Sequence, residues 1–207
     1  MKLNIKSLSE VFKAVREYLF PYEKIQKKLY NINNRDDLKK FVKERSAFVT
    51  QTTLYGYLKT RMGLKYTMMF SDEIFLKSIN KSKWNIFAIS VSDLTLYTFS
   101  YLVSFKNKNL NNIEEFYDEI LENEKVNGMP SDFIEKYKNL FRQTLKEIDL
   151  SNYYQTEPFK ASGQALYNWS PIADELKVLD KEIVLNSIKN KWMLVMKDFQ
   201  DLIKNFD

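Results

Sequence analysis

The chain has 207 residues, of which 44% are hydrophobic and 15% aromatic, and it carries a net charge of +5. It contains no histidine and no cysteine, which excludes a Ser-His-Asp hydrolase, a cysteine nucleophile, and zinc sites built on imidazole or thiolate. Four Gly and four Pro among many large apolar residues favour a packed helical globule over a disordered or many-turned β chain.

The positive charge is concentrated near the start of the chain. Residues 1–65 hold 15 Lys or Arg against 6 Asp or Glu, whereas the remaining residues are net acidic. Such a basic N-terminal third favours an acidic protein partner or an anionic membrane surface, and its alternative interpretation is a solvated, Lys-rich face. Nucleic acid is less favoured, because Lys far outnumbers Arg, whose planar fork reads phosphate and guanine.

The hydrophobic periodicity predicts helices from the start of the chain. Residues 7–19 place apolar side chains on one helical face, and a shorter helix is expected over residues 22–30. Asn34 is the predicted N-cap of the next helix, which runs to Met62 and ends at Gly63. Charges scattered through the first 19 residues leave no apolar signal-peptide region, so we expect a cytoplasmic protein, with peripheral membrane contact an open alternative.

The most apolar segment spans residues 84–105 and follows a shorter helix expected from Ser71 or Asp72 through Ile79. Asp93 is the only charged residue in this segment. A membrane span needs about 20 predominantly apolar residues, and seven Ser, Thr and Asn residues interrupt this one. We therefore predict a central buried helix.

Further helices are expected over residues 113–121 and after the break at residues 128–130, with Ser131 as an N-cap. Residues 150–163 read as irregular. Ser170 and the following Pro171 predict a helix start. Asp180 is the predicted cap of the last helix, whose apolar residues repeat at helical spacing: Val184, Ile188, Trp192, Val195, Phe199, Leu202 and Phe206.

Together these elements predict an all-α fold. We expect a single domain over residues 1–207, a bundle of about seven to nine helices around the central apolar helix at 84–105. The polar residues 106–112 form the one candidate domain boundary.

Two charged residues interrupt apolar stripes and are candidate site residues. Arg45 lies among hydrophobic residues of the helix after Asn34, and Asp93 lies in the central helix. A buried charge is costly unless it is paired, so packing of the two helices would favour an Arg45–Asp93 ion pair, with Arg61 as a competing partner. Such a cluster either fixes the helix register or forms a pocket for a small anion or a polar headgroup; in the remaining alternative, one or both charged groups reach solvent.

A dense group of hydrogen-bonding residues surrounds Gly56, namely Gln51, Thr52, Thr53, Tyr55 and Tyr57. Of these, Gln51, Thr52 and Tyr55 complete the candidate buried polar cluster. Gly inside a helix costs about 1 kcal/mol relative to Ala, which predicts a close helix crossing at Gly56. Tyr55 or Tyr57 could act as a proton donor, although a buried Tyr more often packs its ring and hydrogen-bonds a carbonyl.

The sequence predicts no cofactor and no metal site. Four glycines in the whole chain cannot form a P-loop or a dinucleotide fingerprint, and the nearest approach to a nucleophile elbow, at residues 160–163, lacks its first Gly. Four carboxylates crowd together after residue 117, but such a run is typical of a solvated helix face: Asp118, Glu119, Glu122 and Glu124.

Two segments of the chain resemble a family of alphaproteobacterial proteins of roughly 200 residues, sometimes labelled "esterase". The first is residues 48–63 (FVTQTTLYGYLKTRMG), continuing through residues 70–75 and 78–84, and the second is residues 169–177, continuing through 180–184 with Asn186 and Trp192 beyond. The resemblance implies a bacterial, cytoplasmic origin and, from the label, ester hydrolysis. It brings no catalytic residues with it, and such an enzyme would have to work without histidine.

The function favoured by the sequence is therefore a non-catalytic interaction module that contacts a protein partner or an anionic membrane surface through its basic N-terminal third. A histidine-independent hydrolase of esters or lipids and a nucleic-acid-binding protein are the two alternatives.

Overall fold

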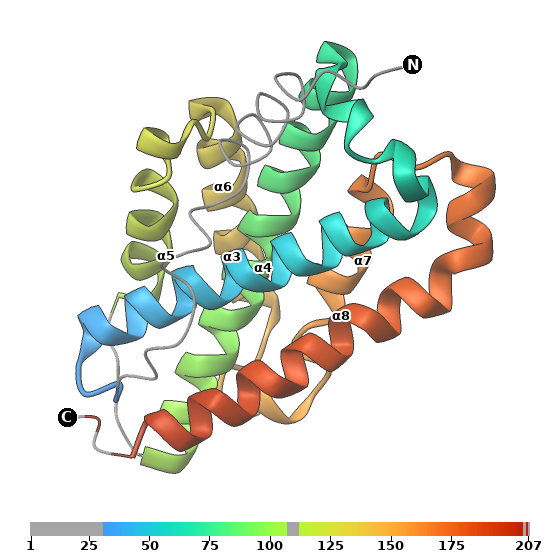
Figure 1. Ribbon diagram of the computed structural model, residues 1–207. Coiled ribbons are helices and arrows are strands. Elements are labelled where there is room, and N and C mark those ends of the chain that lie inside the picture. The colour runs from blue at the N-terminus through green and yellow to red at the C-terminus, as the bar shows by residue number, and fades with distance from the viewer. Residues whose placement is uncertain (1–30, 107–111, 205, 207) are drawn as a thin grey trace, which may run out of the picture.

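The computed structural model describes residues 31–106, 112–204 and 206 of the chain. This part is built of helices and contains no strand, which confirms the all-α prediction (Figure 1). Its six α-helices are α3 (Arg35–Met62), α4 (Glu73–Lys106), α5 (Ile113–Glu122), α6 (Ser131–Glu147), α7 (Lys160–Trp169) and α8 (Asp174–Leu202).

Four short 3₁₀ helices connect these elements: η1 (Gly63–Lys65), η2 (Met68–Ser71), η3 (Lys125–Asn127) and η4 (Tyr153–Gln155). The described residues hold fewer α-helices than the seven to nine predicted for the whole chain. The helices predicted over residues 7–19 and 22–30, and most of the candidate boundary at 106–112, lie outside the described residues.

The central helix is α4, as predicted. It is packed against α3, α5, α6 and α7 (Figure 1), and Phe87, Val91, Leu94 and Leu102 are fully buried along it. One stretch of α4 is long and apolar enough to cross a membrane, with a mean hydropathy of 1.5, but 78% of it is buried inside the molecule. Protein neighbours, therefore, provide the surroundings that its apolar side chains require.

The two helices expected at 71–79 and 84–105 are one continuous element. No Gly or Pro separates Ile79 from Trp84, so nothing in the backbone stops the helix between them. Asp72 caps this longer helix, because its side chain accepts hydrogen bonds from the backbone N–H groups of Ile74 and Phe75 at 2.8 and 3.1 Å.

Both ends of α3 follow the sequence prediction. The Asn34 side chain accepts hydrogen bonds from the backbone N–H groups of Asp36 and Asp37 at 3.0 and 2.9 Å. At the other end Gly63 has a φ of 54°, a left-handed value that glycine adopts without steric cost.

Other helix starts were predicted wrongly. Ser131 is the first residue of α6 rather than its cap, which is Pro130. Ser170 does not begin α8, because its hydroxyl donates to the carbonyl of Leu166 at 2.6 Å and so completes the end of α7. The helix starts four residues later, and Asp180 lies inside it instead of capping it. Part of the segment read as irregular, residues 150–163, forms the first turn of α7.

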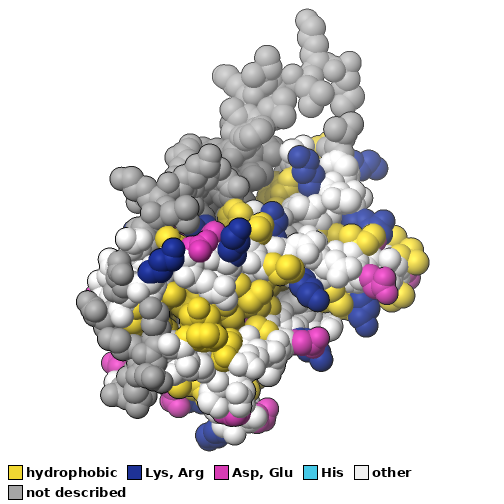
Figure 2. Space-filling view, turned by 90° about the horizontal axis from the view of Figure 1, so that it is seen from below, with side chains coloured by type: hydrophobic (Ala, Val, Ile, Leu, Met, Phe, Trp, Pro, Cys, Tyr) yellow, Lys and Arg dark blue, Asp and Glu magenta, His cyan; other side chains and the backbone are white. Residues whose placement is uncertain are grey.

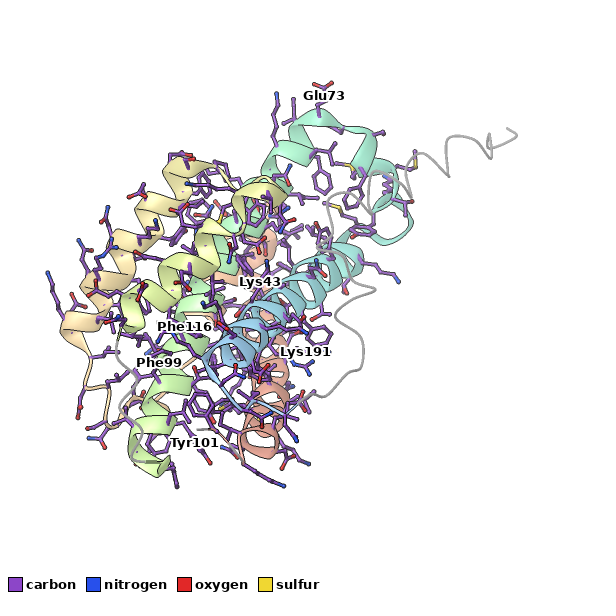
Figure 3. All side chains as sticks on the ribbon, turned by 90° about the vertical axis from the view of Figure 1, so that its left-hand side faces the viewer. Lys43, Glu73, Phe99, Tyr101, Phe116 and Lys191 are labelled. Carbon is purple, nitrogen blue, oxygen red and sulfur yellow. The ribbon has the colours of Figure 1, made fainter. Side chains whose placement is uncertain are left out.

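Aromatic ring pairs pack between neighbouring helices. Phe99 of α4 and Phe116 of α5 meet edge to face with ring centroids 5.0 Å apart (Figure 3), and Tyr117 stacks on Phe141 of α6. Such pairs contribute about 0.5–1.5 kcal/mol each beyond the area they bury. These contacts hold α5 and α6 on one side of α4, with α7 and α8 on the other.

Candidate functional site

The predicted ion pair between Arg45 and Asp93 does not form. The guanidinium of Arg45 lies 3.4 Å from the carboxylate of Asp198 on α8 and over the ring of Phe41. With 20% of its side chain exposed, Arg45 lies at the edge of the α3–α8 contact, where its charge keeps access to water. The prediction was wrong because α8, which the helical periodicity could not place, packs beside α3 and supplies a nearer carboxylate.

Arg61 also turns away from Asp93. Its guanidinium pairs with both carboxylate oxygens of Asp180 on α8, and the hydroxyl of Tyr57 donates to the same carboxylate at 2.8 Å. The hydrogen bond from Arg61 is the largest cause that holds the pKa of Asp180 below its usual value. This bidentate pair joins the end of α3 to the first half of α8. The three predicted charges therefore do not converge.

Asp93 instead lies in a fully buried polar cluster between α4 and α7. Its carboxylate accepts a hydrogen bond from the backbone N–H of Ser162 at 2.8 Å, and the nearby phenol of Tyr153 donates to the carbonyl of Pro158 at 2.9 Å. Burial raises the pKa of Asp93 to about 7, although the hydrogen bond from Ser162 opposes the shift. Because Ser162 is in the first turn of α7, Asp93 works as a cap supplied by a distant helix.

The hydroxyl of Ser162 is fully used within this cluster. It donates to the carbonyl of Phe159 at 3.0 Å and accepts from the indole N–H of Trp192 at 2.9 Å. A serine nucleophile needs its hydroxyl to donate to a base, whereas the Ser162 hydroxyl donates to the backbone carbonyl of Phe159. The arrangement fits helix capping and packing rather than nucleophilic catalysis.

The remaining predicted site residues stay on α3 and do not meet Asp93. Gln51 and Tyr55 are buried, and the ring of Tyr55 stacks on Phe70. The Thr52 hydroxyl donates to the carbonyl of Phe48 at 2.8 Å. Gly56 is exposed, and a Cβ added there would meet no described atom within 4 Å, so the predicted close helix crossing at this glycine is wrong.

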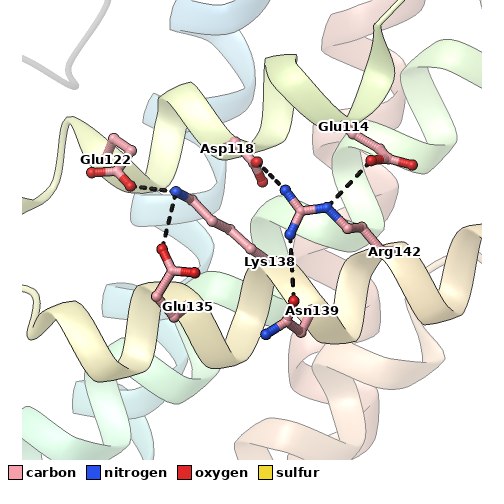
Figure 4. A network of polar contacts seen from close by, with 7 residues as sticks. All are labelled: Glu114, Asp118, Glu122, Glu135, Lys138, Asn139 and Arg142. Atoms are coloured by element: carbon pink, nitrogen blue, oxygen red, sulfur yellow. Dashed lines mark hydrogen bonds and ion pairs between the residues drawn. The ribbon is translucent and has the colours of Figure 1, made fainter.

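The acidic residues of α5 are engaged by cations from neighbouring helices. Figure 4 shows Arg142 of α6 reaching Asp118 at 2.5 Å and Glu114 at 3.3 Å, while Lys138 pairs with Glu122 and Glu135. An open groove of about 950 Å³ runs along this face of α5. Among the described residues, no group of three or more Asp and Glu is placed to hold a metal ion.

Two further carboxylates of this run bind cations of the basic third. Lys39 of α3 pairs with Glu119, and Lys43 lies 2.7 Å from the buried carboxylate of Glu124. Together with Arg45 and Arg61, these lysines are each paired with a carboxylate of the same chain.

The sequence interpretation missed the outward face of α8. Its inward face is buried as predicted, from Val184 through Leu202. A second row of exposed residues follows the opposite side, which we call the outer stripe of α8: Leu176, Leu179, Ile183, Asn186, Asn190 and Met193. Leu179, Ile183 and Met193 are 75, 70 and 54% exposed, and the spacing of three and four residues was the signal that could have revealed the row.

Large apolar side chains in such a row are unusual on a protein surface. Val178 and Leu194, 68 and 60% exposed, border the stripe and widen it. Figure 2, seen from below, shows a hydrophobic patch left of centre and, toward the right, where the first half of α8 lies in Figure 1, smaller hydrophobic areas among charged side chains. Several large apolar side chains exposed on one helix face mark a docking site more often than single exposed residues do.

Comparisons of the chain with protein-family models, with curated proteins and with solved structures found no match. The resemblance to the alphaproteobacterial family therefore stays a prediction, and the candidate site rests on the geometry of the outer stripe of α8.

Proposed function

We propose that the protein is a non-catalytic interaction module that docks a protein partner on the outer stripe of α8. The observation that carries the proposal is the exposure of Leu179 and Ile183, both 70% or more exposed on a helix whose other face is fully packed. A partner helix or groove that covered these side chains would remove their apolar surface from water, at about 25 cal/mol per Å².

The pair of Arg61 and Asp180 supports this use of α8. Asp180 lies beside the stripe on the inward side of the helix, so its attachment to the end of α3 keeps Leu179 and Ile183 directed outward. The exposed surface is thus part of a fixed helix rather than of a loop, which lowers the entropy cost of docking.

Docking through positive charge has less support in the described residues. Lys39, Lys43, Arg45 and Arg61 neutralise carboxylates of the same chain, which leaves less free charge on α3 for an anionic membrane or nucleic acid. The basic residues between 1 and 30 lie outside the described part.

A photo-reactive amino acid at position 183 of the full chain, expressed in its native cells, tests the proposal. We expect an adduct with a protein, which disappears when Leu179 is also changed to Asp. The matched control carries the photo-reactive group at Val126 in η3, an apolar residue that is 89% exposed away from α8. Equal adducts from both positions, or none from position 183, would overturn docking on the stripe.

Co-sedimentation with anionic phospholipid vesicles separates the membrane alternative. Binding that survives the Leu179→Asp and Ile183→Asp substitutions but disappears at high salt would favour the basic N-terminal third as the contact surface instead.

A further inference from the structure

The spacing of the outer stripe identifies the type of partner. Its six residues, from Leu176 to Met193, are separated alternately by three and four positions, and all six are exposed. This is the a/d pattern of a coiled coil, in which apolar side chains recur every 3.5 residues on average along a seam facing a second helix. Over three turns or more, such a seam fits another helix better than it fits a flat surface.

We infer that the helix that covers this stripe is α8 of a second copy of the chain, parallel and in register. The inference rests on the proposed docking role of the stripe and names its partner. The evidence is the order of residue types along the stripe, which distinguishes one pairing from the others.

Parallel, in-register pairing places each stripe residue opposite its own copy. Leu176, Leu179 and Ile183 then form three aliphatic layers, followed by two layers of Asn and one of Met193. The amides of Asn186 and Asn190 make no hydrogen bond to another described residue, so both are available to bond their counterparts across the seam. A buried Asn at such a position sets the register of parallel coiled coils, because a shifted pairing leaves it facing an apolar side chain.

Antiparallel pairing creates a conflict in each register that overlaps most of the stripe. When Leu176 faces Met193 of the second copy, Asn186 faces Ile183 and Asn190 faces Leu179. A shift that makes Asn186 face Asn190 of the second copy places the two Lys189 side chains next to each other beside the seam. The shift in the other direction, in which Leu176 faces Asn186, does the same for the two Glu182 side chains. Unpaired amides and like charges across a seam both disfavour association.

The charges beside the stripe are compatible with the parallel pairing. Beside the seam, Glu182 of one copy would meet Ser187 of the other, and Lys189 would meet Leu194. Neither pair brings like charges together. The third pair joins Glu175 to Asp180, whose charge is already bound by the guanidinium of Arg61.

The absence of cysteine from the chain makes the test clean, because every engineered thiol is the only one present. We would prepare Leu179→Cys and Met193→Cys separately, with Val126→Cys as the exposed control, and oxidise each purified full-length protein. Parallel in-register pairing brings both stripe positions onto their own copies, so both variants should form disulfide dimers and the control should not. Positions 179 and 193 are about 21 Å apart along the helix, so an antiparallel pairing can cross-link at most one of them.

Analytical ultracentrifugation of the unmodified chain measures the association itself. We expect a concentration-dependent dimer whose dissociation constant rises about 10-fold or more in Ile183→Asp, since one buried aliphatic side chain per copy is lost. A chain that stays monomeric at high concentration, or cross-linking at only one of the two stripe positions, would overturn the inference. The photo-adduct at position 183 would then have a mass other than that of two chains, so this failure is distinguishable from failure of the proposed docking role.

Discussion

Arg61, near the end of α3, forms a bidentate ion pair with Asp180 on α8, although the two residues are separated by 119 positions in the sequence. Tyr57, one turn before Arg61, donates a third hydrogen bond to the same carboxylate. The cluster joins the first half of α8 to the end of α3, alongside the buried apolar side chains of Val184, Ile188 and Trp192 on the inward face of the helix. Both kinds of contact leave the opposite face of α8 in solvent.

The attachment of α8 should weaken in acid. The pKa of Asp180 is lowered in the folded chain, so its contribution to stability is present above the ordinary Asp pKa of 3.8 and is lost as the pH falls below it. We expect Asp180→Asn to lower the melting temperature near neutral pH, with a difference from the parent that shrinks progressively as the pH falls below 3.8. Thermal melts of both proteins over this pH range measure it.

The matched control for this variant is Asp201→Asn, an exposed residue on the same helix. Its melting temperature should follow that of the parent at every pH. If Asp180→Asn behaved in the same way, the contact with Arg61 would not stabilise the fold.

Asp93 should produce the opposite dependence on pH. Its folded pKa of about 7 is above the unfolded value, so its contribution favours the folded state in acid and is lost as the pH rises from about 4 to above 7. Asp93→Asn removes the titration, so between about pH 4 and pH 8 the free energy of unfolding should shift by about 4 kcal/mol in favour of the variant relative to the parent. Urea unfolding at the two pH values measures this change, and a difference that does not vary with pH would contradict it.

Gly56 should be replaceable with a gain in stability. The residue is in the interior of α3, is exposed, and has open space where a Cβ would lie among the described atoms. Gly56→Ala is therefore expected to raise the free energy of unfolding by about 1 kcal/mol.

Gly63 provides the contrasting variant on the same helix. Its φ of 54° is strained for any residue with a side chain, so Gly63→Ala should lower the free energy of unfolding by about 1 kcal/mol. Denaturant melts compare the two variants, and a loss of stability in Gly56→Ala would show that a neighbour occupies this position.

Ser162→Ala should destabilise the buried cluster. The substitution leaves the indole N–H of Trp192 without its acceptor in a fully buried position, at a cost of about 1–3 kcal/mol. The exposed Ser187→Ala on α8 is the control and should change the free energy of unfolding by less than about 0.5 kcal/mol.

The same serine also provides a test of the hydrolase alternative. Because its hydroxyl is occupied on both sides, we expect no labelling of Ser162 by a serine-directed probe and no turnover of short-chain esters by the purified chain. Labelling that disappears in Ser162→Ala would instead support the esterase function implied by the resemblance.

Local signals in the sequence predicted local structure well. Asn34 and Gly63 mark the two ends of α3 because capping depends on the residue itself and on its immediate neighbours. The inward face of α8 was predicted for a similar reason, since apolar side chains repeated every turn must be buried together. The helix start predicted at Ser170 was wrong because a serine hydroxyl can hydrogen-bond either to the end of one helix or to the start of the next, and here it donates to Leu166 at the end of α7.

Side-chain contacts between residues that are far apart in the sequence could not be predicted from such local signals. Because Arg45 and Asp93 lie on apolar stripes, the sequence predicted that each would have a polar partner, and each has one. Their actual partners, Asp198 and Ser162, lie on helices whose placement depends on the packing of the whole bundle.

The sequence by itself determined that this chain is helical, that residues 84–105 belong to its core, and that chemistry based on histidine or cysteine is excluded, because composition and periodicity are properties of the chain alone. Only the tertiary structure decided which charges pair and which face of α8 stays in solvent. Helical periodicity shows that Leu179 and Ile183 share a face, but whether that face is buried depends on how α8 packs in the bundle, where its inward residues enter the core and Asp180 pairs with Arg61.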